Sequence, residues 1–171
     1  AWGCTVNAWR DGTRLLPRTG TWPAPFASLP TTLLLTPLAV GNDAGPGATD
    51  LVVFASGRGA AGVLPANALI ASAASVSIGS TSGYRRGDLL LMTPSASAGA
   101  CQIGQVDSTF TVTSGVAAPS QVPTTTVGAP YNTADGFTTL AQPAEYSLIN
   151  LGSTPSIQML GVNDRGQLVL L

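Results

Sequence analysis

The stretch "AEYSLINLGSTPSIQMLGVNDRGQLVLL" (residues 144–171) predicts three short strands in succession, at 145–151, 156–162 and 166–171. The turn residues at 163–166, Asn-Asp-Arg-Gly, suit a hairpin loop between the last two strands. Similar apolar runs bounded by turn residues predict further strands at 50–56, 75–80, 87–93, 101–106 and 109–114. Several of these runs alternate apolar and polar side chains, as a sheet with one face in water requires. The chain is therefore predicted to be mostly β, with antiparallel hairpins.

Helix is expected in only two places. Residues 1–16 are predicted to be the end of an N-terminal helix or the connection that follows it, because their apolar residues recur roughly on one side. Gly12 and Pro17 are typical of the end of such a helix. The Ala-rich stretch 64–74 predicts one or two further helical turns. The predicted fold class is α+β, mostly β in this chain.

Length and composition indicate one domain with an uncharged polar surface. A chain of 171 residues suits a single domain and buries roughly 70% of its unfolded surface. Charged residues make up 9% of the chain, against about 25% in a typical protein. The weak charge repulsion between such molecules favours their association.

Cys4 and Cys101 are the two cysteines of the chain, which is an even count. A single disulfide fits this count if the chain folds in an oxidising compartment, and two buried thiols are the alternative. Two cysteines without a histidine do not complete a four-ligand zinc site.

The residue types exclude most catalytic machinery. The sequence contains no histidine and no lysine, so Ser-His-Asp triads, Cys-His pairs, Schiff-base lysines and P-loops are all excluded. A carboxylate pair for glycoside hydrolysis would have to come from Asp88, Asp107 or Asp135, each of which is more typical of a turn. We predict that the protein is not an enzyme, has no catalytic residues and uses no cofactor.

Two motifs suggest ligands without the context that such ligands need. Residues 57–62 match the dinucleotide pattern G-x-G-x-x-G, but Pro65 ends any helix and no acid follows about 20 residues later, so an inter-strand loop is favoured. Asn42, Asp43 and Asp50 offer oxygens for calcium, but the spacing is not that of an EF-hand. No metal site is predicted.

The basic residues are all arginine, and three of the seven, Arg10, Arg14 and Arg18, lie near the start. This spacing favours a solvated face over a phosphate-binding one, and no basic stripe indicates a nucleic-acid partner. The Leu-rich stretch 31–40 is too short to span a membrane and contains Pro37. Neither end has the features of a natural terminus, so the chain is expected to be a piece of a longer protein.

A familiar adhesion tripeptide, Arg86-Gly87-Asp88, lies within "YRRGDLLLMTP" (84–94). An integrin-binding loop needs its aspartate at an exposed tip, whereas here an apolar run that must be buried follows directly. Gly87 and Asp88 are therefore predicted to form a structural turn, with Asp88 hydrogen-bonded to nearby backbone N–H groups.

Three segments occur in an order typical of one known family. "GATDLVVFAS" (47–56) is similar to the family's Gly-x-Asp followed by an apolar strand. "YRRGDLLLMTPSASAGACQIGQV" (84–106) is similar to its aromatic-x-x-Gly-Asp strand, short turn and second strand. Residues 144–171 are similar to its Tyr-containing strand and closing hairpin. In these features the chain resembles the PilW-type minor pilins of type IV pilus assembly and, more weakly, the pseudopilin J class of type II secretion.

The resemblance implies one pilin-like globular domain over residues 1–171, with 1–16 as the helix end or αβ connection and 17–171 as a β-rich head. It implies an antiparallel sheet with the end of an N-terminal helix packed on it, and an apolar helix upstream of residue 1 that anchors in the inner membrane and later in the filament core. A disulfide between Cys4 and Cys101 would join the helix end to the sheet.

The implied function is that of a structural subunit that helps to initiate or cap a type IV pilus through pilin–pilin contacts. The implied partners are other minor pilins, the major pilin and a tip adhesin. The implied location is the bacterial cell envelope, at the inner membrane facing the periplasm before assembly and in the extracellular pilus afterwards. The alternatives are an extracellular adhesin that uses Arg86-Gly87-Asp88, another β-rich assembly or virion domain, and a carbohydrate-active enzyme.

Overall fold

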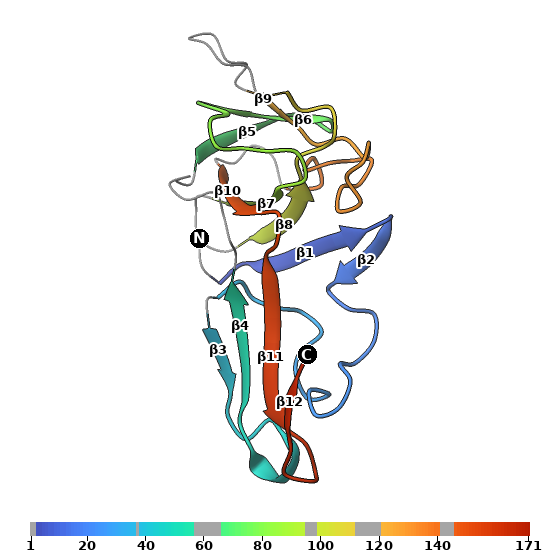
Figure 1. Ribbon diagram of the computed structural model, residues 1–171, viewed down its shortest axis with the longest axis vertical. Coiled ribbons are helices and arrows are strands. Elements are labelled where there is room, and N and C mark those ends of the chain that lie inside the picture. Colours follow the sequence, from blue (N-terminus) through green and yellow to red (C-terminus); the bar gives the residue numbers. More distant parts are fainter. Residues whose placement is uncertain (1–2, 37, 57–65, 95–98, 112–120, 141–145) are drawn as a thin grey trace.

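The computed structural model describes residues 3–36, 38–56, 66–94, 99–111, 121–140 and 146–171 (Figure 1). The described residues form twelve strands and a short 3₁₀ turn, η1 (Pro46–Ala48), with no α-helix among them. No helix in these ranges is therefore long and apolar enough to cross a bilayer. The strands are β1 (Thr5–Arg10), β2 (Thr13–Leu16), β3 (Leu38–Gly41), β4 (Leu51–Ser56), β5 (Ala66–Ser72), β6 (Ser75–Ile78), β7 (Leu89–Pro94), β8 (Ala100–Gln105), β9 (Gln121–Pro123), β10 (Tyr146–Gly152), β11 (Ser156–Val162) and β12 (Leu168–Leu170).

The larger sheet has eight strands in the order β2-β1-β8-β7-β10-β5-β6-β9. Its strands pair antiparallel except β1 and β8, which run parallel with Val6 opposite Cys101. The apolar run of β7 lies near the centre, where Leu90, Leu91 and Met92 are at most 2% exposed. A strand covered on both faces needs such a continuous apolar run, which explains why this segment lacks alternation.

The smaller sheet has four antiparallel strands in the order β12-β11-β4-β3. The chain passes from the larger sheet into the smaller one between β10 and β11, after Gly152, whose φ of +76° favours glycine. In Figure 1 the smaller sheet occupies the lower half of the molecule, with β11 along its middle, and the β1–β2 hairpin, at one edge of the larger sheet, projects sideways above it. The two sheets therefore lie one above the other along the long axis.

Two main apolar clusters form the core, one within the larger sheet and its loops and one between the larger sheet and the smaller. Tyr84, Met92, Phe137 and Leu148 lie in the cluster of the larger sheet. The other cluster fills the space between the β1–β2 hairpin, the loop that follows it and one face of the smaller sheet. Its contacts are close, because a Cβ at Gly161 would lie 2.5 Å from Leu51 Cδ2. Close packing of this kind fixes the position of the smaller sheet against the hairpin above it.

The disulfide between Cys4 and Cys101 joins the residue before β1 to β8. Both cysteines are buried, with Leu91, in a third small cluster at the junction of the two halves. Its sequence separation of 97 residues means that it closes more than half of the chain into one loop.

The prediction of a helix end at residues 1–16 is wrong, because residues 5–16 form β1 and β2. Val6 and Ala8 are buried while their neighbours are half-buried, which is the period of a strand. The apolar residues of this segment therefore follow the two-residue period of a strand and not the period of a helix. The strand is held by its parallel partner β8, which lies far along the chain.

Two smaller predictions are also wrong. The stretch predicted to be helical at 64–74 contains β5, because pairing with β6 and β10 outweighs the helical propensity of alanine. The strand predicted at 109–114 is not present at 109–111, where Asp107 holds the Thr109 backbone in a turn, and the remaining residues lie outside the described ranges.

Candidate functional site

The outward face of the smaller sheet consists almost wholly of apolar side chains. Strand register places Leu38, Phe54 and Gln158 side by side in one row across β3, β4 and β11. The next row contains Val40, Val52, Leu160 and Leu170, and Val162 lies opposite Leu168. We call this surface the apolar face, and its members are Leu38, Val40, Val52, Phe54, Leu160, Val162, Leu168 and Leu170, with Gln158 as the polar member; Ser156 lies at the end of the same face.

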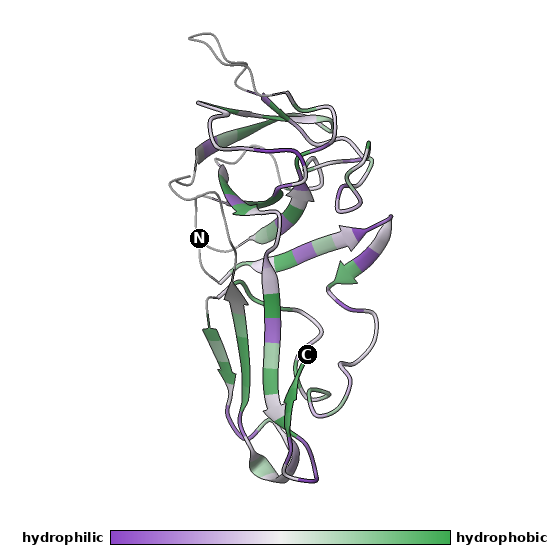
Figure 2. Cartoon of the chain, viewed as in Figure 1, coloured by the Kyte–Doolittle hydropathy of each residue, from purple (hydrophilic) through white to green (hydrophobic). Residues whose placement is uncertain are grey.

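No described segment covers the apolar face at its two edge strands. Leu38 and Val40 in β3 are 59% and 58% exposed, and Leu168 and Leu170 in β12 are 70% and 59% exposed. Figure 2 shows the same strands as hydrophobic along their length. Exposed apolar patches of a few hundred Å² commonly mark interaction sites.

The opposite face of the same sheet is covered in part, since Ala39 and Ile157 on it are exposed. Leu51, Val53, Met159 and Val169 point into the cluster beneath the β1–β2 hairpin. The sheet thus has apolar residues on both faces, which is typical of a sheet covered on both sides. The sequence signal for this is the run "LVVF" (51–54), which does not alternate. The sequence predicts a strand over this run, and its lack of alternation is the signal that apolar residues occupy both faces of that strand.

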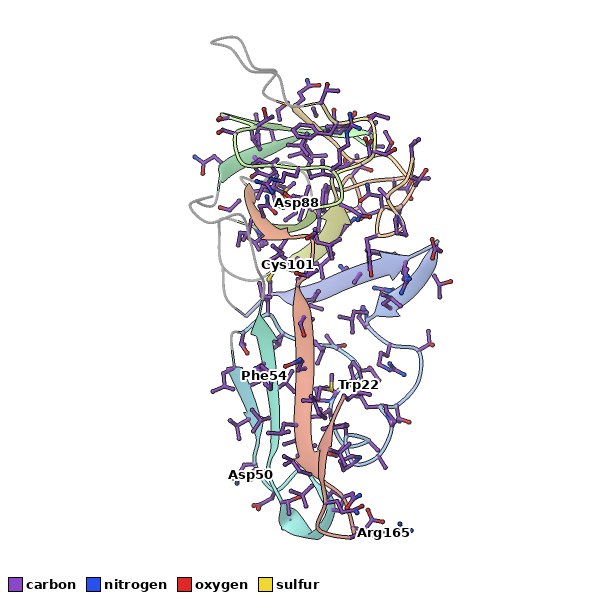
Figure 3. The ribbon with its side chains drawn as sticks, in the orientation of Figure 1. Trp22, Asp50, Phe54, Asp88, Cys101 and Arg165 are labelled. Carbon is purple, nitrogen blue, oxygen red and sulfur yellow. A yellow bond between two sulfur atoms is a disulfide. The ribbon has the colours of Figure 1, made fainter. Side chains whose placement is uncertain are left out.

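The adhesion tripeptide forms the turn before β7. Gly87 has a φ of +83°, and its backbone N–H donates to the Val106 carbonyl over 2.9 Å. The Asp88 carboxylate is 5% exposed and accepts bonds from the Arg85 backbone N–H at 2.9 Å and from Asn150 Nδ2 at 2.8 Å. Asp88 thus joins the turn to β10, and its oxygens do not face solvent. Figure 3 shows it within the larger sheet.

Asp107 lies in a second buried turn. Its carboxylate accepts bonds from the backbone N–H and hydroxyl groups of both Thr109 and Thr125. Burial opposes ionisation, but these bonds outweigh it and hold the pKa of Asp107 below its usual value. Burial, and then the charge of Asp88, raise the pKa of Tyr84. Asp88 and Asp107 are both turned inward, so neither can contact a sugar substrate.

The remaining residues singled out in the sequence form ordinary turns or lie outside the described ranges. The Asp135 carbonyl accepts from the Thr138 backbone and hydroxyl in an exposed turn. The Asp50 carboxylate accepts from the Asp43 backbone N–H at 3.0 Å, and Asn42 donates to Asp43 at 3.2 Å. Within the described ranges no three acidic, histidine or cysteine residues group as metal ligands. Residues 57–62 lie outside those ranges.

Comparisons of the chain with family models, with curated proteins and with solved structures find no match.

Proposed function

We propose that this chain is a minor pilin, a structural subunit that helps to initiate or cap a type IV pilus through contacts with other pilins. The observation that carries the proposal is the apolar face of the smaller sheet, whose edge strands no described segment covers. A pilin-like subunit needs such a surface, because its N-terminal helix packs on an antiparallel sheet. The segment order of the sequence supports the same proposal independently of the apolar face.

The dimensions of the apolar face favour a helix as its occupant. Four strands spaced about 4.8 Å apart and about five residues of 3.3 Å each make a surface of roughly 300 Å². A stable dimer needs about 800 Å² from each partner, so the face alone is too small to hold a second copy. A helix is about 10 Å wide, and roughly 11 residues of it span the strand length.

The chemistry of the apolar face favours a helix surface without charge. Its members carry no charged side chain, and Gln158 is the polar group among them. A charged occupant would lose its hydration without gaining a partner, which costs free energy. The occupant is therefore expected to present an apolar stripe at the helical spacing.

The remaining features are those of an extracytoplasmic assembly subunit. The disulfide suits an oxidising compartment, and the low charge content favours close association with other subunits. Adhesion through Arg86-Gly87-Asp88 is not proposed, because the aspartate is buried and bonded within its turn.

The proposal is tested by placing a charge on the apolar face of the full-length gene product. Leu168→Asp is expected to abolish incorporation into sheared surface filaments, because an unpaired carboxylate would be buried against the helix. Leu69→Asp is the matched control, since Leu69 in β5 is 66% exposed but belongs to the larger sheet. Equal incorporation of both variants would contradict the proposal.

The gene upstream of residue 1 provides an independent test. The proposal requires a short basic leader followed by about 20 mostly apolar residues, long enough for a membrane-spanning helix. An ordinary secretory signal without such a helix would exclude a pilin.

A further inference from the structure

Three arginines of the β1–β2 hairpin and the loop after it each lie over an aromatic ring. The guanidinium carbon of Arg18 is 4.5 Å from the centre of the Trp22 ring. That of Arg14 is 5.6 Å from Trp9, and that of Arg10 is 5.8 Å from Tyr131. We call these three pairs the arginine hairpin; Arg14 lies opposite Trp9 and Arg10 opposite Thr13, so Arg10 and Arg14 project from opposite faces of the hairpin near its tip. The sequence spacing alone favoured a solvated face, and only the fold supplies the rings.

Hydrogen bonds hold two of these arginines in place. Arg14 donates from Nε to the Leu16 carbonyl at 3.2 Å and from Nη2 to Asn7 Oδ1 at 3.0 Å. Arg18 donates from Nε to the Gly20 carbonyl at 3.4 Å. A guanidinium has five N–H donors, so in the described structure each keeps at least three for a ligand. All three side chains are exposed. A fixed guanidinium loses less entropy when it binds than a mobile one.

The charge around the arginine hairpin differs from that of the remaining chain. Residues 1–41 carry a net charge of +2, with Asp11 as their one acid, while residues 42–171 carry −3. Arg10 and Asp11 form an ion pair at 3.7 Å, but both side chains are more than half exposed, so water screens it. The positive charge at the hairpin is therefore available to an anion.

We propose that the arginine hairpin binds single-stranded nucleic acid. Phosphates accept from the remaining guanidinium N–H groups, and bases stack on the outward faces of the guanidinium planes. An acidic polysaccharide fits less well, because sugars stack on open aromatic faces. Here Trp22 is buried, Trp9 and Tyr131 are half-buried, and an arginine lies over each ring. This binding does not depend on the pilin proposal.

The test is the salt dependence of binding to a fluorescent 12-nucleotide oligo(dT), followed by anisotropy. Three phosphate contacts predict a slope of about −2 for log K against log salt, since each single-strand contact contributes about −0.7. Arg14→Gln is expected to weaken binding and to change the slope to about −1.4. Arg165→Gln is the matched control, because Arg165 is exposed in the hairpin between β11 and β12, away from Trp22 (Figure 3).

A second variant separates stacking from charge. Arg14→Lys keeps the positive charge but removes the planar guanidinium on which a base can stack. The slope of log K against log salt should therefore stay near −2 while the affinity falls. Thermal unfolding of each variant checks that the hairpin remains folded. The absence of binding, an unchanged slope in Arg14→Gln, or equal affinity for polygalacturonate of matched charge would each overturn the proposal.

Discussion

The two sheets of this protein differ in which polar side chains they bury and in which apolar side chains they expose. The buried polar side chains of the described structure, among them Asp88, Gln102, Asp107 and Asn132, all belong to the larger sheet and its loops. The smaller sheet buries none of them and instead exposes Leu38, Val40, Leu168 and Leu170. The larger sheet therefore pairs most of its buried polar side chains, with the Tyr84 hydroxyl, Gln105 Oε1 and Thr124 Oγ1 buried without a partner among the described residues, while the smaller sheet has an apolar surface that no described segment covers at its edge strands.

Hydrogen bonds from buried side chains connect the loops of the larger sheet to its strands. Asn132 donates to the Gln105 and Thr125 carbonyls and accepts from the Gln105 backbone N–H. Gln102 donates to the Gly136 carbonyl at 2.6 Å and accepts from the Thr139 hydroxyl. Each network ties a loop to a strand, so the larger sheet is expected to keep its structure without a partner.

The largest effect is expected at the disulfide, which ties the residue before β1 to β8 within the larger sheet. The double variant Cys4→Ala, Cys101→Ala should lower the free energy of unfolding by up to about 4.7 kcal/mol, the chain-entropy value for a loop of about 100 residues. Urea unfolding measures this, and reduction of the unmodified protein should give a similar loss. A loss below about 1 kcal/mol would show that the pairing of β1 with β8 and the packing around it hold this part of the larger sheet without the disulfide.

A large effect is also expected in the core of the larger sheet. Leu148 is fully buried in β10, so Leu148→Ala should cost about 2–5 kcal/mol through lost burial and the cavity left behind. Chemical denaturation measures the change. Leu69→Ala, at an exposed position of the neighbouring strand β5, is the control and should change stability little.

A moderate, pH-dependent effect is expected at Asp107. The fold lowers its pKa below 3.8, so its contribution to stability is complete above that pH and is lost as the pH falls through the folded value. Asp107→Asn should therefore cost about 1.5–3 kcal/mol at pH 7, and the difference from the unmodified protein should shrink near pH 2. Unfolding at both pH values tests this, with the exposed Asp135→Asn as control. A pH-independent difference would contradict it.

The smallest effect is expected on the apolar face of the isolated domain. Leu168→Ser removes an apolar side chain that is 70% exposed, so stability should change by no more than about 0.5 kcal/mol. Thermal unfolding measures this. A loss above about 2 kcal/mol would show that some part of the chain already covers the face, and the contrast between the two sheets would no longer hold.

Much of the β structure was predictable because local patterns carry it. The strands at 50–56, 87–93 and 156–162 agree with β4, β7 and β11 within two residues, since short apolar runs between turn residues suit few other structures. The loop at 163–166 also follows from local chemistry. The Asn163 side chain accepts from the Arg165 and Gln167 backbone N–H groups, and Gly166 adopts a φ of +73°.

The candidate site was less predictable because its residues are far apart in the chain. Leu38, Val52, Leu160 and Leu170 share one face only after β3, β4, β11 and β12 pair. The aromatic rings that lie against the arginines differ in how far they are from them along the sequence. Trp9 lies close to Arg14 in sequence, but Tyr131 reaches Arg10 only through the loop that packs against the hairpin.

The sequence by itself determined that the chain is mostly β, that its turns lie at glycine and asparagine positions, and that histidine and lysine chemistry is absent. Local backbone preferences and residue identity suffice for these conclusions. The tertiary structure alone decided that residues 5–10 and 13–16 are strands, that Asp88 is buried and that no described segment covers the edge strands on one face of the smaller sheet. Burial depends on which distant segments meet, and no local pattern contains that information.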